Sequence, residues 1–293
     1  MKKKIYLSIG VILLAFLVVA SIVAIPYIKR ANEYPVSFDL TPAKENSVSI
    51  ANYQNKDYIN SYDKHLNNHF ATDKKHISEF LKIFKEMKFK ETEQWGGQQW
   101  ENEDFAYSCG YSSFSDDGGS YNAYINKDNL IYLEVITFND NGNDNIQTFY
   151  EGILTKKLKL KLDRYIKSLR EFNDKQNTVT VSADMSLQDI TKAVIKNHLD
   201  IHLNTDTNRL FQFEKYELLD VEMLDSKKNI YAVGYLYKFT PVSASYITTT
   251  GEINPETNEI KDYQYVFIQK ISDTEYKLMN IHAQYYGDVW DDF

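Results

Sequence analysis

Hydrophobic positions in the first half of the chain follow helix-like and then strand-like spacing. Spacings of three and four residues predict a helix from Asp73, which Thr72 or Asp73 can cap. Its apolar face would hold Ile77, Phe80, Leu81, Phe84 and Met87. Strand-like runs at 105–114, 120–125 and 129–138, separated by turn-forming residues, predict an antiparallel meander. A second helical stripe predicts a helix at about 152–172.

The second half repeats this order of a helix before strands. The polar segment 172–178 predicts a break between domains. Ser186 and Asp189 then have the spacing of a capping box at the start of a helical stripe. Four strand-like runs follow, at 216–224, 230–239, 262–271 and 276–283.

These patterns predict the α+β fold class, with two α+β domains that contain antiparallel sheets. We expect the first domain at 57–173 and the second at 177–293, the latter a helix plus a four-stranded sheet. Residues 31–56 lack clear periodicity and contain two prolines, so we expect a stalk there.

The N-terminal segment has a different pattern, an uncharged run from Ile5 to Ile28 flanked by basic residues. As a helix, these 24 residues would be about 36 Å long, enough to cross a bilayer core of about 30 Å. A cleaved signal peptide is the alternative, but its apolar stretch is normally about 7–15 residues. We therefore expect an uncleaved signal-anchor, with residues 1–30 as cytoplasmic tail and transmembrane helix.

Charge sets the orientation of the span and narrows the class of partner. Three lysines precede the run and two basic residues follow it, which favours a cytoplasmic N-terminus and extracytoplasmic domains. The chain carries −8 in total and residues 1–30 carry +5, so the remainder carries −13. Such an acidic ectodomain repels phosphate backbones, and we expect no nucleic-acid partner. Cys109 is the single cysteine, which excludes an internal disulfide and favours a small buried side chain.

The C-terminal half resembles a known fold by the order of its elements. A helix followed by a four-stranded antiparallel sheet, over about residues 177–285, resembles the cystatin-like or nuclear-transport-factor-2-like (NTF2-like) cone. The segment 181–199 and the strand region around 248–271 also resemble uncharacterised membrane-anchored surface proteins of Gram-positive bacteria. These resemblances imply a location and a domain plan, and they supply no catalytic residue.

Histidine spacing offers weak metal-site candidates. His65 and His69, and likewise His198 and His202, stand four residues apart, which on a helix places two imidazoles on one face. Neither pair has a predictable third ligand, and the first lacks the glutamate of a zinc-protease helix. We therefore expect structural or surface histidines, no metal and no cofactor.

Aromatic residues in polar surroundings are the candidates for ligand binding. Trp95 and Trp100 enclose two glycines and two glutamines, and their indoles could stack on sugar rings or clamp a peptide. Tyr285, Tyr286 and Trp290 form a similar group near the C-terminus. Packing against a sheet edge is the alternative for both groups.

No catalytic signature is present, since the sequence lacks a nucleophile elbow, a phosphate loop and a dinucleotide fingerprint. We expect a non-enzymatic, membrane-anchored binding protein of the cell envelope, whose partner is an envelope protein, a peptide or a wall polymer. Two alternatives remain: an envelope hydrolase that uses the C-terminal cone, and a wall-polysaccharide binder that uses Trp95 and Trp100.

Overall fold

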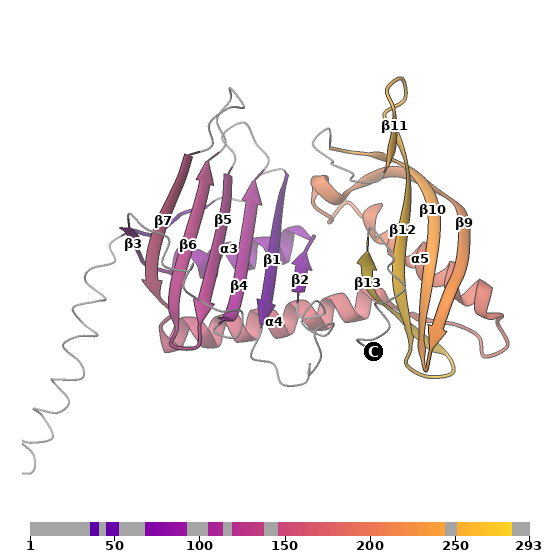
Figure 1. Cartoon of the computed structure of the whole chain (residues 1–293), viewed down its shortest axis with the longest axis horizontal. Coiled ribbons are helices and arrows are strands. Elements are labelled where there is room, and N and C mark those ends of the chain that lie inside the picture. The colour runs from indigo at the N-terminus through magenta and orange to yellow at the C-terminus, as the bar shows by residue number, and fades with distance from the viewer. Residues whose placement is uncertain are drawn as a thin grey trace, which may run out of the picture.

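Two antiparallel sheets and three α-helices make up the described part of the molecule, which confirms the α+β class (Figure 1). The structure is a computed structural model, and it describes residues 36–40, 45–52, 68–92, 105–113, 119–137, 146–243 and 251–282. Within these ranges no helix is long and apolar enough to cross a membrane. The span predicted at residues 5–28 lies outside the described residues.

The first sheet has seven strands in the order β2-β1-β4-β5-β6-β7-β3. Its strands are β1 (Asn46–Asn52), β2 (Asn68–Ala71), β3 (Phe89–Thr92), β4 (Phe105–Ser113), β5 (Gly119–Asn126), β6 (Leu130–Thr137) and β7 (Ile146–Ile153). Helices α3 (Lys74–Lys85) and α4 (Lys156–Asn177) pack their apolar stripes against one face of it.

The first core confirms the predicted helical stripe and meander. Asp73 caps α3 by accepting a hydrogen bond from the His76 backbone N–H, 3.0 Å away. The stripe of α3 is buried against alternate residues of the strands, including Tyr107, Cys109 and Leu133. Cys109 is therefore the small buried side chain that the sequence predicts, and burial raises the pKa of its thiol.

Three sequence predictions about this half are wrong in detail. Part of the expected stalk is strand β1, whose Val48 and Ile50 alternate with serines and are fully buried. The helix expected from 152 begins at Lys156, because residues 146–153 form β7 and Thr155 caps the helix. The expected polar break at 172–178 is mostly helical, since α4 continues to Asn177 before β8 begins.

The second sheet has the strand order β8-β13-β12-β10-β9, with β11 paired to β12. Its strands are β8 (Thr178–Thr180), β9 (Phe213–Lys227), β10 (Ile230–Pro241), β11 (Glu252–Asn254), β12 (Glu259–Lys270) and β13 (Glu275–His282). Helix α5 (Leu187–His202) covers one face, and its N-cap Ser186 accepts a hydrogen bond from Asp189 N–H, as predicted. The four long strands were predicted, whereas the three-residue β8 and β11 were not.

Apolar and aromatic side chains fill the space between α5 and its sheet. Ile190, Val194 and Leu199 of the helix pack against a row of rings on β10. Tyr235, Tyr237 and Phe239 follow one another at centroid distances of 5.2 Å, and Phe213 stacks on Phe239 at 4.2 Å. Ring stacking therefore accounts for much of the aromatic content of this half.

A buried polar contact joins the two sheets. Asn46 of β1 and Asn208, just before the short helix η3 (Arg209–Phe211), are 0% and 2% exposed. Asn208 Nδ2 donates to Asn46 Oδ1 at 2.6 Å, and Asn208 Oδ1 accepts from Asn46 N–H at 3.2 Å. The backbone N–H of Asn208 also donates to Thr72 O at 2.6 Å. Because α4 also contacts strands of both sheets, the halves are linked at two places (Figure 1).

Candidate binding surfaces

Strand β9 forms one edge of the second sheet and is fifteen residues long. Among the described residues it pairs with β10 alone, so its other edge carries backbone groups without a neighbouring strand (Figure 1). Such an edge is a template for pairing with another chain, and proteins usually protect it.

Two kinds of protection occur along β9. Register shifts against β10 leave Glu214, Leu219 and Leu224 as extra residues, and such bulges interrupt a regular edge. In addition, Asp220 Oδ1 accepts from Val221 N–H at 2.9 Å, and Asp225 Oδ1 accepts from Ser226 N–H at 2.7 Å. These carboxylates occupy donors that an incoming strand would need. The section before Leu219 has no such capped donor among the hydrogen bonds of the described residues.

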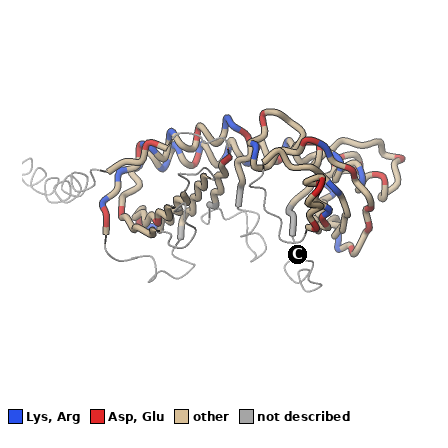
Figure 2. The backbone as a smooth tube through the Cα atoms, turned by 90° about the horizontal axis from the view of Figure 1, so that it is seen from above, with Lys and Arg blue, Asp and Glu red and all other residues tan. Residues whose placement is uncertain are grey.

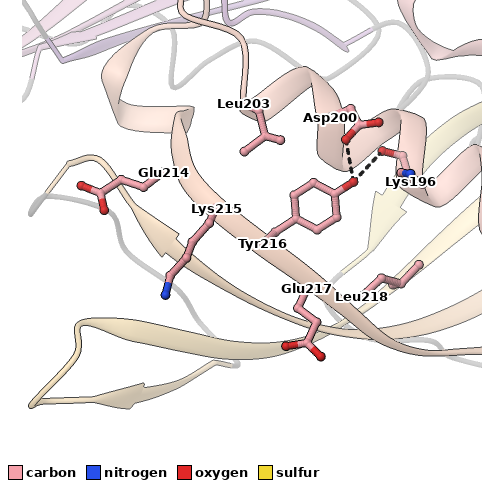
Figure 3. A pocket seen from close by; sticks show the side chains of 8 residues that line it. All are labelled: Lys196, Asp200, Leu203, Glu214, Lys215, Tyr216, Glu217 and Leu218. Carbon is pink, nitrogen blue, oxygen red and sulfur yellow. Dashed lines mark hydrogen bonds between the residues drawn. The ribbon is translucent and has the colours of Figure 1, made fainter.

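An open hollow of about 480 Å³ lies beside this uncapped section (Figure 3). Its walls are Lys196, Asp200 and Leu203 on the α5 side and Glu214, Lys215, Tyr216, Glu217 and Leu218 on β9. Consecutive strand residues point to opposite faces of a sheet, so a hollow lined by five of them in sequence runs along the strand edge.

Tyr216 fixes the inner wall of this hollow. Its side chain points from β9 towards the helix, and its hydroxyl donates to Asp200 Oδ1 at 2.6 Å (Figure 3). Burial, with the Asp200 bond second, raises the pKa of this phenol beyond its ordinary range, so it is a neutral donor at physiological pH. Leu203, at the end of α5, is 39% exposed and supplies an apolar surface.

The charge along β9 is mainly negative. Its exposed ionisable side chains are one lysine, Lys215, and five acids, Glu214, Glu217, Asp220, Glu222 and Asp225. Lys238 of β10 offsets one of them, since its Nζ lies 2.9 Å from Glu217 Oε2. Elsewhere in the described chain both signs are intermixed (Figure 2). The edge of β9 therefore favours a positively charged neighbour.

The outer face of the first sheet, opposite its helices, is a second candidate surface, and the side chains on it are half-buried. Residues that alternate with the buried ones on β1, β4, β5 and β6 lie opposite α3 and α4. They are mostly uncharged and polar or aromatic: Ser47, Ser49, Ser108, Gly110, Ser112, Ser120, Asn122, Tyr124 and Tyr132.

Hydrogen bonds cross four strands on this face. Ser112 and Ser120 share a bond of 3.2 Å, and Asn122 Nδ2 donates to Glu134 Oε2 at 3.1 Å. Gln147 Nε2 donates to the other oxygen of that carboxylate. Tyr124 and Tyr132 lie opposite each other on β5 and β6. Amides, hydroxyls and paired rings are the groups that recognise sugars.

The histidine pair His198 and His202 lies between α5 and the sheet, with ring centroids 5.0 Å apart. His202 Nδ1 is 2.7 Å from Phe211 O, and its ring stacks on Phe213. Burial lowers the pKa of His198 to about 3, and that of His202 in the same direction. Within the described residues no group of three potential metal ligands occurs, and this half-buried pair packs beside Phe213.

The remaining predicted site residues, apart from His69, fall outside the described part of the chain. These are Trp95, Trp100, Tyr285, Tyr286, Trp290 and His65. His69 belongs to strand β2, where its backbone is opposite Ile50, so the helical spacing proposed for His65 and His69 does not apply. Sequence reasoning missed the hollow at β9, although the run at 216–224 with its alternating acids was recognised as a strand.

No protein-family model, no curated protein and no solved structure matches this chain.

Proposed function

We propose that the protein is a membrane-anchored, extracytoplasmic binding protein of the cell envelope. It holds another envelope component and carries out no reaction of its own. The N-terminal uncharged run supports the anchor, and its flanking lysines support the orientation. The order of α5 and the strands after it supports the proposed likeness to the NTF2-like cone.

The hollow along the free edge of β9 is the observation that carries this proposal. It combines apolar side chains, charged side chains and backbone groups on one accessible surface, as protein recognition requires. The space between α5 and its sheet is instead filled by packed rings and aliphatic side chains. That packing favours binding over the alternative of a hydrolase that uses the cone interior.

Intact cells provide the test. Protease added outside should digest the ectodomain of the full-length chain, and cross-linking in intact cells should recover one specific envelope partner. The matched control is the same cells treated with external protease before cross-linking, so that the ectodomain is already removed. Cross-linking should then recover no partner. Full-length protein free in the cytosol, or an ectodomain protected from external protease, would contradict the proposal.

A second candidate function is binding of a wall polysaccharide, and the outer face of the first sheet favours it. That face is uncharged apart from Glu134 and a few residues near its borders, and it presents Tyr124 opposite Tyr132. Tyr132→Ala should then weaken binding to isolated wall polymer by about tenfold, since aromatic stacking contributes about 1 kcal/mol or more. Trp95→Ala/Trp100→Ala tests the other aromatic group in the same assay, and unchanged binding by both variants rejects this function.

A further inference from the structure

We propose that β9, between Glu214 and Leu218, receives a basic, extended segment of another protein as an added strand. This inference rests on the proposed function and names the chemistry of the partner. Strand addition supplies affinity through main-chain hydrogen bonds and specificity through pockets for alternate side chains. Both features are present at this part of the edge.

Backbone geometry limits the added strand to the N-terminal third of β9. The side chains of Tyr216, Leu218 and Val221 all pack towards α5. Residues with side chains on one face of a strand direct their backbone groups to the same edge, so these three share the free edge. Asp220 caps the Val221 N–H, whereas no side chain of the described residues caps the N–H of Tyr216 or Leu218. The bulge at Leu219 separates the two sections.

The hollow provides the side-chain pockets. A segment lying along Tyr216 and Leu218 would direct every second side chain towards α5, where Leu203 offers an apolar surface. A volume of about 480 Å³ is in the range of recognised binding sites. Side chains directed the other way would lie near Glu214, Lys215 and Glu217 on the outer side of the edge, where acids outnumber the lysine.

Charge identifies the occupant. The proposed section holds two exposed acids, Glu214 and Glu217, and one lysine, Lys215, and three more exposed acids continue along the same strand beyond the bulge, so a strand with lysine or arginine at alternate positions gains attraction. A second copy of this chain is disfavoured, because everything after residue 30 carries −13. Among the possible neighbours of this edge, we therefore select a basic segment of a different protein.

Synthetic peptides test the inference on the full-length protein in detergent. The probe is an eight-residue peptide of alternating lysine and valine, measured by fluorescence anisotropy at low ionic strength. One comparison peptide replaces lysine by glutamate. The other replaces valine by proline, which keeps the charge but removes backbone donors. The lysine–valine peptide should bind at least about tenfold more tightly than either comparison peptide.

Two tryptophan variants form a matched pair on α5. Leu203→Trp places a large ring in the hollow and should weaken binding of the lysine–valine peptide by about tenfold. Leu187→Trp changes a leucine of similar exposure, 38% against 39%, at the other end of α5, and binding should stay within about twofold. Equal binding by both variants, or binding of the lysine–proline peptide as tightly as the lysine–valine peptide, overturns the inference.

Charge reversal gives an independent readout that does not depend on filling the hollow. Glu214→Lys should weaken binding of the basic peptide, whereas Glu256→Lys, an exposed acid in the turn before β12, should not. Concentration-dependent dimerisation that Leu203→Trp abolishes would overturn the choice of a basic partner in favour of a second copy. A partner cross-linked in cells equally by wild type and Leu203→Trp supports the proposed function and rejects this site.

Discussion

The first sheet ends on both sides in strands of four residues, β2 and β3, whereas the second ends on one side in the fifteen-residue β9. The first has two helices on its covered face, and the second has one. Short edge strands leave few unpaired backbone groups, and a long one leaves many. Among the described residues, the first sheet therefore leaves few edge groups unpaired, while the second leaves a long free edge.

The largest expected effects come from truncating one ring in each core. Phe80→Ala and Phe239→Ala remove side chains that are 0% and 1% exposed, and each should cost about 3–5 kcal/mol of unfolding free energy. Because Asn46 and Asn208 join the halves, both variants should shift one common transition in urea, followed by tyrosine fluorescence. If the wild-type protein instead unfolds in two separate urea transitions, the halves unfold independently and this prediction is wrong.

Asn208→Ala tests the junction itself. It removes the side-chain hydrogen bonds to Asn46 and to Leu210 N–H at a buried position, and should cost about 1–3 kcal/mol. The urea transition should also broaden or split. Asn254→Ala is the control, because it removes one exposed hydrogen bond, to Glu256 N–H, far from the junction. An equal, small effect of both substitutions would mean that the Asn46–Asn208 contact does not couple the halves.

Substitution of one glycine in each sheet by alanine tests how well that sheet tolerates an added methyl group. A Cβ at Gly152 of β7 would lie 2.6 Å from the backbone oxygen of Lys88, which cannot move without displacing β3. A Cβ at Gly234 of β10 would lie 1.9 Å from Tyr263 Oη, the end of a side chain that can rotate away. We expect Gly152→Ala to cost about 1–3 kcal/mol and Gly234→Ala about half of that, mainly through the lost Tyr263–Glu222 bond. Thermal unfolding measures both, and the reverse order would contradict the comparison.

Acid should weaken the second core before the first. The folded protein holds His198 and His202 neutral, while the unfolded chain binds their protons near pH 6.5. Because their pKa values are lowered by folding, stability is highest above about pH 6.5 and falls as the pH drops from 6.5 towards 3. His76 in the first core instead has the Asp73 carboxylate 2.7 Å away. His198→Phe should flatten the pH dependence of stability between pH 7 and 5, and an unchanged slope would contradict this assignment.

Much of the fold could be predicted because its signals are local. The spacing of apolar residues predicts the stripe of α3 and the four long strands. The spacing of Ser186 and Asp189 predicts the cap of α5. Strand β1 was missed because Val48 and Ile50 give only a short alternation, and β8 and β11 have three residues each. The continuation of α4 through a polar stretch depends on partners distant in sequence, such as the Lys277–Asp174 ion pair.

The candidate site was harder to predict, because it depends on which strand ends a sheet. The run at 216–224 is recognisable as a strand, but strand order is a property of the whole fold. The pairing of Tyr216 with Asp200 likewise brings together residues sixteen positions apart on different elements. Aromatic residues attracted attention in the sequence, whereas the edge of β9 is marked by backbone groups that no sequence pattern reveals.

Hydrogen exchange at individual β9 amides tests the central claim most directly. Exchange is measured on the full-length protein with and without the lysine–valine peptide. The account predicts that the amides of Tyr216 and Leu218 exchange quickly alone and slow by about tenfold or more with peptide, while Val221 and Ser226 are unchanged. Unchanged exchange at Tyr216 and Leu218 under saturating peptide, or slowing spread evenly along β9, would contradict it.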